Sequence, residues 1–478
     1  MKTAARLQLV SIAIIIMLSG GFLRFYKLGD WSFANDETST LGEVKTMFTD
    51  EQVSPEDPAY RLPRIIPLSY LILHAGNTLF GADEFGSRVI LAMLGTAILG
   101  IIFIFLDGLM GRPVAIATSV LTALWTEHIY HSQQTRFYII AAFFSFLCML
   151  AGAVTLKQKN TGWGIFTCCL ALAAILSHSV MVVLLPIVFM GILVGSYAER
   201  RPVPRKLWLF FPAAAILAAG FFLFYLSPLI HGWNPGATWG YSVTHSILAS
   251  INMISWPISL LAAIGLILMI HERSAQNWYW VVCAFGWIAA TMVFPLYVSY
   301  HPSYVFPLAF SGIVLAGFTI GEIYKFLRQR SVLIGAVWVG LACLLNLPSL
   351  VSHYADGSRP DMRTAANYVK SHWQAGDRVA GTAMGRFRYY AQGYAPTIPL
   401  APGAAAIPKL KDLINSQGRL WIVLESQRGG IPEELDRWLQ NNTIHQVRVQ
   451  QRRFDYQENT MDVFLYTPSV DQRYAVKP

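Results

Sequence analysis

The sequence predicts a polytopic α-helical membrane protein followed by a small α/β domain. Three observations support this fold class. The 478-residue chain is 54% hydrophobic and only 13% charged, whereas soluble domains are about a quarter charged. Its long apolar runs approach the roughly 20 residues that a helix needs to cross the ~30 Å hydrocarbon core of a bilayer. After about residue 352 the composition changes to that of a soluble domain.

The apolar runs predict about eleven transmembrane helices. The first follows Lys2 and Arg6, and no A-x-A-like cleavage site precedes Arg24, so we expect an uncleaved helix rather than a signal peptide. The expected helices lie near residues 7–23, 88–108, 113–131, 136–156, 162–178, 180–197, 207–226, 247–270, 278–297, 303–324 and 332–351.

Segment 62–80 is apolar but differs from these runs. It contains two prolines, an arginine, a histidine and an asparagine. If this segment crossed the membrane fully, the basic loops that follow it would no longer all lie on the cytoplasmic side. We therefore expect a helix that lies at, or dips into, the outer interface.

The basic residues predict the topology, because Lys and Arg accumulate in cytoplasmic loops. When the basic clusters and Arg112 are placed in the cytoplasm, segment 24–61 forms the first external loop and the carboxyl-terminal domain lies outside the cytoplasm. We therefore expect a multi-pass protein of the cell membrane. The net charge of +9 is spread over loops rather than gathered in one patch, which argues against nucleic-acid binding. The clusters are Lys157/Lys159, Arg200/Arg201/Arg205/Lys206, His271/Arg273 and Lys325/Arg328/Arg330.

The carboxyl-terminal part predicts a separate domain of residues 352–478, after a membrane domain of residues 1–351. Helical spacing of apolar residues over 361–374 and alternating helix and strand patterns beyond it are typical of an α/β domain. Further helices are expected near 408–416 and 432–441, and strands near 378–383, 419–424, 443–451 and 461–466.

The acidic pair Asp36-Glu37 is the first candidate for chemistry. It follows the first helix, so a carboxylate there can accept the proton of an acceptor hydroxyl that attacks a sugar carbon. The alternative is structural, because acids are common in exposed loops. Asn35 or Asp36 would then cap a helix over 38–48.

The sequence His131-Ser-Gln-Gln-Thr-Arg136-Phe-Tyr138 is the second candidate, at an expected outer helix junction. The guanidinium of Arg136 suits the oxygens of a lipid phosphate, and ionisable groups at membrane depth are costly and usually functional. Alternatively, Arg136 snorkels to the interface and Tyr138 belongs to an aromatic belt.

Three histidines, His178, His245 and His301, are expected at outer helix ends. A divalent metal held by them and Glu127 is possible, but no ligand spacing supports it. Interfacial hydrogen bonding is the more common role of such histidines. The sequence therefore requires no metal or other cofactor.

The sequence Arg386-Phe-Arg388-Tyr389-Tyr390 lies in the external domain. Alternating arginines and rings can stack on sugars or bind an anionic acceptor. They can equally pack the domain onto the membrane part, which is the interpretation we favour.

The order of these motifs resembles that of membrane glycosyltransferases with the GT-C fold. This group includes protein O-mannosyltransferases and the aminoarabinose transferases of lipid A. The resemblance covers most of the chain, although each motif is short. It lies in a first helix ending at Arg24, Asp36-Glu37, LFGADEFGSR at 79–88, QQTRFY at 133–138 and SRPDMRTAANYVKSHWQAGDRV at 358–379.

The resemblance implies a GT-C type enzyme that uses a polyprenyl-phosphate sugar. It implies that Asp36 is the catalytic base, that Glu37 is its acidic neighbour, and that Arg136 and Tyr138 line the donor pocket. Some members carry an acid a few residues after the arginine, whereas Ile139, Ile140 and Ala141 occur here, which argues against the protein O-mannosyl branch. Further donor-binding candidates are Arg61, Arg64, His131 and His178.

Two other functions remain open. A polymerase or ligase of diphosphate-linked glycans would share the architecture. A transporter or flippase of lipid-linked sugars would instead show inverted repeats and broken helices. The acceptor of a transferase would be a glycan, lipid or protein, and we expect loop 227–245 and the external domain to select it.

Overall fold

The structure is a computed structural model that divides into two compact units. The helical unit comprises Met1–Leu28 and Glu43–Leu350, and the α/β unit comprises Gly29–Gly42 and Val351–Pro478. Segment 29–42, which belongs to the expected first external loop, is thus part of the α/β unit. The structure describes residues 2–48, 58–200, 207–220, 242–297, 301–356, 359, 361–391, 393, 395–415, 418–427, 431–452 and 458–468.

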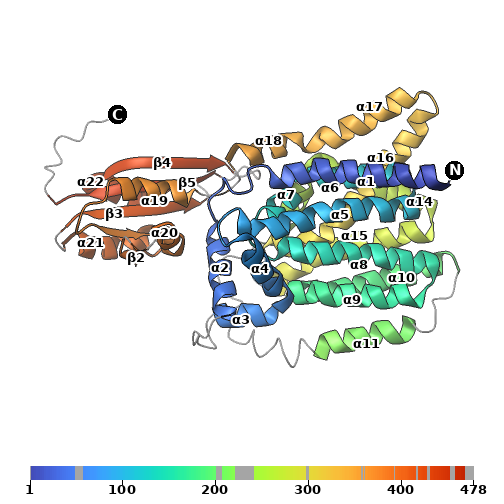
Figure 1. Ribbon diagram of the computed structural model, residues 1–478, viewed down its shortest axis with the longest axis horizontal. Helices are drawn as coiled ribbons and strands as arrows, with labels where there is room; N and C mark the ends of the chain where they lie inside the picture. The colour runs from blue at the N-terminus through green and yellow to red at the C-terminus, as the bar shows by residue number, and fades with distance from the viewer. Residues whose placement is uncertain are drawn as a thin grey trace. The chain divides into compact units, whose positions relative to one another are not determined.

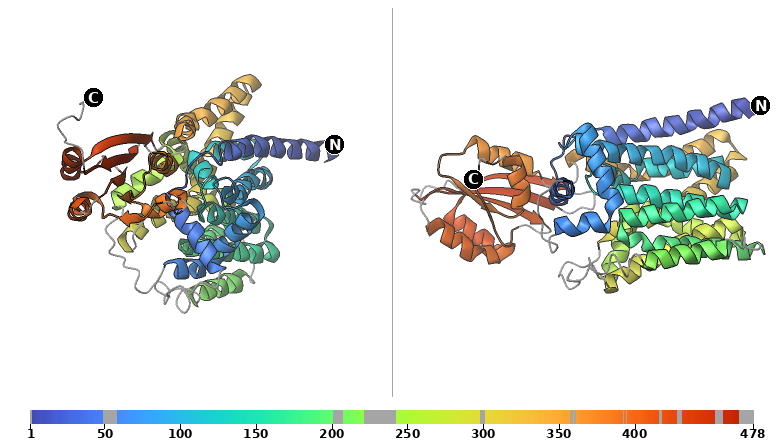
Figure 2. Two further views of the ribbon diagram at one scale, coloured as in Figure 1. Left: turned by 60° about the vertical axis from the view of Figure 1, so that its left-hand side comes forward. Right: turned by 60° about the horizontal axis from the view of Figure 1, so that its bottom comes forward.

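The helical unit is a bundle of helices that alternate in direction (Figures 1 and 2). Neighbouring helices pack in pairs such as α1 with α5, α8 with α9 and α10 with α15. Helix α2 (Asn35–Met47) crosses the division between the units. The other elements are α1 (Lys2–Phe25), α3 (Pro58–Ile65), α4 (Pro67–Phe80), α5 (Gly86–Met110), α6 (Arg112–Leu124), α7 (Thr126–Ser132), α8 (Tyr138–Gln158), α9 (Thr161–Ser177), η1 (Ser179–Val183), α10 (Leu184–Ala198), α11 (Leu207–Gly220), α13 (Val243–Ile254), α14 (Trp256–Glu272), α15 (Ala275–Tyr297), η3 (Pro302–Tyr304), η4 (Phe306–Ala309), α16 (Phe310–Arg328), α17 (Val332–Cys343), η5 (Leu344–Asn346) and α18 (Leu347–Asp356).

The alternation gives the bundle two different ends. One end, here the polar end, contains the end of α1 at Phe25, α7, the start of α8, and the residues around η1, η3 and η4. The opposite end contains Arg112, Lys159, Arg273 and Arg330 at the helix junctions. Basic residues thus lie at these four junctions, where the positive-inside rule expects cytoplasmic loops, and Arg24, Arg88 and Arg136 lie at the polar end.

Seven described helices are long and apolar enough to cross a membrane, or eight if the bent pair α13–α14 is one span. Two shorter apolar helices, Arg112–Leu124 and Thr161–Ser177, accompany them. The figure of about eleven stays a prediction. Helices α3 and α4 are separated at Ile66 and are not among the candidate spans.

Two of the expected continuous helices are interrupted. Helix 247–270 breaks at Ser255, and its parts α13 and α14 meet at 95°. Pro257 explains the break, because it lacks an N–H and its ring clashes with the carbonyl four residues earlier, at Met253. Helix 113–131 breaks at Trp125, whose backbone is extended at φ −70° and ψ 109°, and no proline or glycine marks this site.

The α/β unit contains a five-stranded sheet in the order β2-β1-β3-β5-β4. Strands β2 (Thr397–Pro399), β1 (Arg378–Gly381) and β3 (Leu420–Gln427) are parallel, whereas β5 (Glu458–Tyr466) and β4 (Ile444–Arg452) pair antiparallel. The helices are α19 (Met362–Ser371), α20 (Met384–Ala391), α21 (Ile407–Asn415) and α22 (Glu433–Asn442), with η6 (Gly403–Ala406).

The two faces of this sheet carry different helices. Trp421 and Val423 of β3 pack with α19 and α20. Ile422 and Leu424, which alternate with them, pack with α21 and α22. The period of two along β3 thus builds a hydrophobic layer on each side of the sheet. Helices α19 and α20 share one face, and both contact segment 29–42 as described below.

Candidate functional site

The acidic pair occupies the first turn of α2, and its two members have different environments. The Asp36 side chain is exposed, whereas Glu37 is fully buried. The Glu37 Oε2 atom accepts a hydrogen bond from the backbone N–H of Ala34 at 2.9 Å. This is the glutamate half of a capping box, with Ala34 at the N-cap position. Both acids also lie where the helix dipole favours negative charge.

Four side chains of the α/β unit hold segment 29–42. The guanidinium of Arg359 lies 3.7 Å from the Glu37 carboxylate, and both groups are buried. Arg363 of α19 donates to the carbonyls of residues 29, 30 and 31 at 3.3–3.4 Å. The N–H of Phe33 donates to the Tyr390 hydroxyl at 2.6 Å, and Tyr389 packs against the Phe33 ring edge-on at 5.3 Å.

The sequence Arg386–Tyr390 therefore has a structural role on α20. Arg386 is buried and paired with Glu425, and Arg388 donates to the Thr397 hydroxyl at 3.0 Å. Phe387 lies in the core beneath α20. The two tyrosines of this sequence, Tyr389 and Tyr390, contact segment 29–42.

The polar end of the helical unit contains the second predicted group. Arg136 is half-buried, and its guanidinium lies over the Phe137 ring at 4.4 Å and near the Tyr138 ring at 5.9 Å. The ring of His178 packs against that of Tyr138 at 5.7 Å and against that of Tyr304 at 5.5 Å. A cation beside a cluster of rings and a histidine can bind an anionic headgroup.

The protonation state of His178 is fixed by its surroundings. Burial and the Arg136 charge lower the pKa of His178 to about 3. Its Nδ1 atom accepts from the N–H of Val180 at 3.3 Å. His178 is therefore a neutral hydrogen-bonding group, not a cation.

Glu43 and Tyr70 form a buried pair that the sequence analysis missed. Glu43 is 7% exposed, and it accepts a short hydrogen bond from the Tyr70 hydroxyl. Burial and the Glu43 carboxylate raise the pKa of Tyr70 well above its usual value, whereas the Arg136 charge lowers it. Arg136 is thus close enough to act on both Tyr70 and His178. The only sequence signal was a glutamate on an otherwise polar helix.

His131 is buried within a network on α7. Its Nε2 atom lies 3.1 Å from the Glu127 carboxylate, and its Nδ1 atom lies 3.3 Å from the Gln134 side-chain oxygen. Gln134 in turn donates to the Tyr130 hydroxyl at 3.3 Å. The ring of His131 also contacts that of Tyr138 at 4.8 Å. His131 therefore packs against Tyr138, another of the predicted donor-binding residues.

Arg24 lies beside the break between α6 and α7. Its fully buried guanidinium donates to the carbonyls of Thr122 and Ala123 at 3.1 and 3.2 Å and to His128 Nδ1 at 2.8 Å. These carbonyls lack their usual partner four residues later because α6 ends there, although the N–H of Trp125 donates to the Thr122 carbonyl at 3.4 Å. Burial and the Arg24 charge lower the pKa of His128 well below its usual value. Gly95 of α5 makes room mainly for Ser132 and also for Arg24, since a Cβ there would clash with Ser132 Oγ and lie 3.2 Å from Arg24 Nε.

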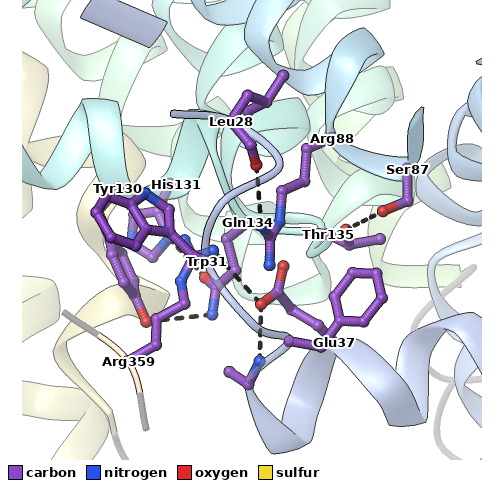
Figure 3. Close-up of polar contacts among 12 residues, drawn as sticks. Leu28, Trp31, Glu37, Ser87, Arg88, Tyr130, His131, Gln134, Thr135 and Arg359 are labelled. Carbon is purple, nitrogen blue, oxygen red and sulfur yellow. Dashed lines mark hydrogen bonds and ion pairs between the residues drawn. The ribbon is translucent and has the colours of Figure 1, made fainter. Parts of the chain in front are cut away.

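The chain just before segment 29–42 is anchored at the polar end. Gln133 donates to the carbonyls of residues 23, 24 and 26 at 3.0–3.3 Å. Arg88 points toward the carbonyl of Leu28 and donates to it at 3.0 Å (Figure 3). Ser87 next to it bonds the Thr135 hydroxyl at 2.9 Å (Figure 3). Arg88 is the last residue of the LFGADEFGSR stretch. Through Arg88, this stretch holds the chain that follows α1.

The remaining candidates are less informative. Arg64 is half-buried in α3, and the side chain of Arg61 lies outside the described residues. His245 is exposed at the start of α13, and His301 accepts from the N–H of Ser303 at 3.3 Å. Most of loop 227–245 is also outside the described part of the chain. Among the residues that are described, no three His, Cys, Asp or Glu side chains are grouped to hold a metal.

Comparison with solved structures gives the fold. ArnT from Cupriavidus metallidurans in the apo state matches with a TM-score of 0.59 at 12% identity, over 97% of this chain and 98% of that one. The same protein bound to undecaprenyl phosphate matches with a TM-score of 0.57 at 11% identity, over 98% and 99% of the chains. Both are GT-C fold glycosyltransferase structures.

The chain has the GT-C fold. A second GT-C protein agrees. The archaeal oligosaccharyltransferase AglB from Archaeoglobus fulgidus, in complex with an inhibitory peptide and a dolichol-phosphate, matches with a TM-score of 0.55 at 10% identity, over 88% of this chain and 70% of that one. No protein-family model and no curated protein matches the sequence. The predicted GT-C architecture is therefore confirmed at the level of the fold.

Proposed function

We propose that this chain is a glycosyltransferase of the cell membrane. It transfers a sugar from a polyprenyl-phosphate carrier to a glycan, lipid or protein acceptor outside the cytoplasm. The observation that carries this proposal is the fold likeness to ArnT over nearly the full length of both chains. One ArnT structure holds undecaprenyl phosphate and the AglB structure holds dolichol-phosphate, so a polyprenyl-phosphate donor suits this fold.

In the proposed reaction the acceptor oxygen attacks the anomeric carbon of the sugar. The new C–O bond forms as the bond from that carbon to the phosphate oxygen breaks. Asp36 accepts the acceptor proton. It suits this role because its carboxylate is exposed in the first turn of a helix. Glu37 is buried and capping, so we assign it to support of Asp36.

The leaving group is a lipid phosphate, which departs as a stable anion and needs no strong acid. A fixed cation stabilises the charge that develops on it. We assign this role to Arg136, with Tyr138 beside it. His131 and the neutral His178 hold the Tyr138 ring, and Arg61 and Arg64 are further candidates for the phosphate. The mechanism as proposed does not depend on a metal.

The first test replaces the base. The purified protein is reconstituted in vesicles with polyprenyl-phosphate sugars and a candidate acceptor, and sugar transfer is measured. Asp36→Asn should abolish transfer at unchanged folding. Asp30→Asn is the matched control, because Asp30 is an exposed aspartate of the same segment and should keep full activity. Full activity of Asp36→Asn would remove the base assignment.

The second test addresses the donor. Arg136→Ala should mainly raise the KM for the lipid-linked donor, and Arg136→Lys should restore only part of it because lysine lacks the planar fork. Arg330→Ala is the control, since Arg330 also lies over a phenyl ring, that of Phe326, at 5.4 Å, but at the opposite end of the bundle. Unchanged donor kinetics in Arg136→Ala would exclude its role.

The substrates can be named by comparing a deletion strain with its parent. Accumulation of one lipid-linked sugar together with an under-glycosylated surface product would give donor and acceptor at once. A product that loses a whole repeating glycan would instead support the polymerase or ligase alternative.

The transporter alternative predicts broken helices, and α13–α14 is one. However, α13 packs against η3 and η4, so this break is at the polar end rather than in the middle of the bundle. Uptake of a lipid-linked sugar across vesicles without any transfer would nevertheless favour that alternative.

A further inference from the structure

The α/β unit is joined to the acidic segment by contacts of a particular kind. Arg359 forms an ion pair with Glu37. Arg363 donates hydrogen bonds to backbone carbonyls of segment 29–42, and the Tyr390 hydroxyl accepts one from the N–H of Phe33. Arg363 also lies 5.9 Å from the Tyr390 ring. The residues come from three places in the unit and meet on one short stretch of chain. This stretch carries the proposed base.

Glu37 is the most demanding part of that stretch. Its carboxylate is fully buried, and burial of a charge is unfavourable unless an opposite charge and hydrogen bonds compensate it. The N–H of Ala34 provides one hydrogen bond, and Arg359 provides an opposite charge at 3.7 Å. Loss of Arg359 would remove this counter-charge and favour movement of the carboxylate toward water. Asp36 would move with it, because the two residues share one helical turn.

We propose that Arg359 is a positioning residue, which fixes the first turn of α2 through Glu37 and thereby orients the Asp36 carboxylate. The catalytic meaning of this inference rests on the proposed function. The α/β unit then holds the segment that carries the proposed base.

The experiment uses the full chain and two readouts. Hydrogen exchange of peptides covering residues 29–42 reports the position of the segment, whatever the activity is. Sugar transfer gives kcat and the donor KM. The variants are Arg359→Met, the conservative Arg359→Lys, Glu37→Gln and the double variant. Tyr390→Phe is a milder second route, because it removes only the hydroxyl that accepts the Phe33 N–H.

Arg359→Met should speed exchange in the segment and lower kcat about 100-fold at an unchanged donor KM, as expected for misplacement of a catalytic group by about 1 Å. Arg359→Lys should recover part of both. A glutamine at position 37 still caps Ala34 but no longer needs a counter-charge, so the double variant should have a higher kcat than Arg359→Met alone.

Arg419→Met is the matched control. Arg419 lies 3.4 Å from the buried Asp377, an ion pair within the sheet region of the same unit. Its loss should leave exchange in segment 29–42 and kcat unchanged. Equal exchange in Arg359→Met and wild type would overturn the inference. Faster exchange with unchanged transfer would uphold the positioning but refute Asp36 as the base.

Discussion

Replacement of Arg24 tests how the polar end is held together. Arg24→Met keeps a long side chain but removes every donor. Thr122 retains a bond from the N–H of Trp125 at 3.4 Å, so the carbonyl of Ala123 and the Nδ1 atom of His128 lose most. Each buried acceptor left without a partner costs about 1–3 kcal/mol. We therefore expect the free energy of unfolding to fall by about 2–6 kcal/mol.

The buried cysteines provide the assay. The assay uses a background that lacks the half-buried Cys168 and the exposed Cys169. The remaining three, Cys148, Cys283 and Cys343, are buried, free thiols, so a thiol-reactive fluorophore labels them only when the bundle opens. Labelling is followed against denaturant or temperature in detergent. Arg24→Met should label at clearly milder conditions than wild type, and Arg24→Lys should be intermediate because one ammonium cannot reach all acceptors.

Arg112→Met is the control for loss of an arginine from the bundle. Arg112 pairs with Asp107 at 3.0 Å but is 36% exposed, and such surface pairs contribute about 0–1 kcal/mol. If Arg24→Met were no less stable than Arg112→Met, Arg24 would not hold the carbonyls at the break, and the account of the polar end would be wrong.

Three further predictions use the same labelling assay. Tyr70→Phe removes the hydroxyl that donates to the buried Glu43 carboxylate and should cost about 1–3 kcal/mol; equal stability would mean that other groups satisfy the carboxylate. Trp125→Phe removes the indole N–H that donates to the Met253 carbonyl at 2.6 Å and should cost a similar amount; unchanged labelling would show that another group satisfies this carbonyl. His178 has a pKa of about 3 in the fold but near 6.5 when unfolded, so the unfolded state binds more protons and stability should fall as the pH drops below about 6.5; a slope that His178→Asn does not reduce would refute this.

The sequence predicted the parts of the fold that composition determines. Runs such as 86–110 and 138–158 are apolar enough to be recognised as helices from hydropathy alone. Strands β1, β3, β4 and β5 also lie where short apolar runs indicated them. The break at Ser255 was predictable from Pro257 but was overlooked, because hydropathy averages across a single proline.

Other features depend on residues that are distant in the sequence. The Trp125 break has no local signal, since the stretch 112–132 is compatible with one helix. Its cause is tertiary, because Trp125 is buried and bonded to Met253, and Arg24 takes the freed carbonyls. The partnership of Glu37 with Arg359 is of the same kind. Position in the chain drew attention to the acidic pair, but only the structure separates its exposed member from its buried one.

The polar helix α7 is buried in an apolar bundle. All seven of its residues are buried, including Glu127, His128 and His131. Burial of such polar groups is unfavourable unless they are paired; Arg24 donates to His128, and Glu127 lies 3.1 Å from His131. The same Arg24 guanidinium donates to the two carbonyls at the end of α6. Arg24 therefore compensates both the break after α6 and the burial of the helix that follows it, so Arg24→Met should disturb both.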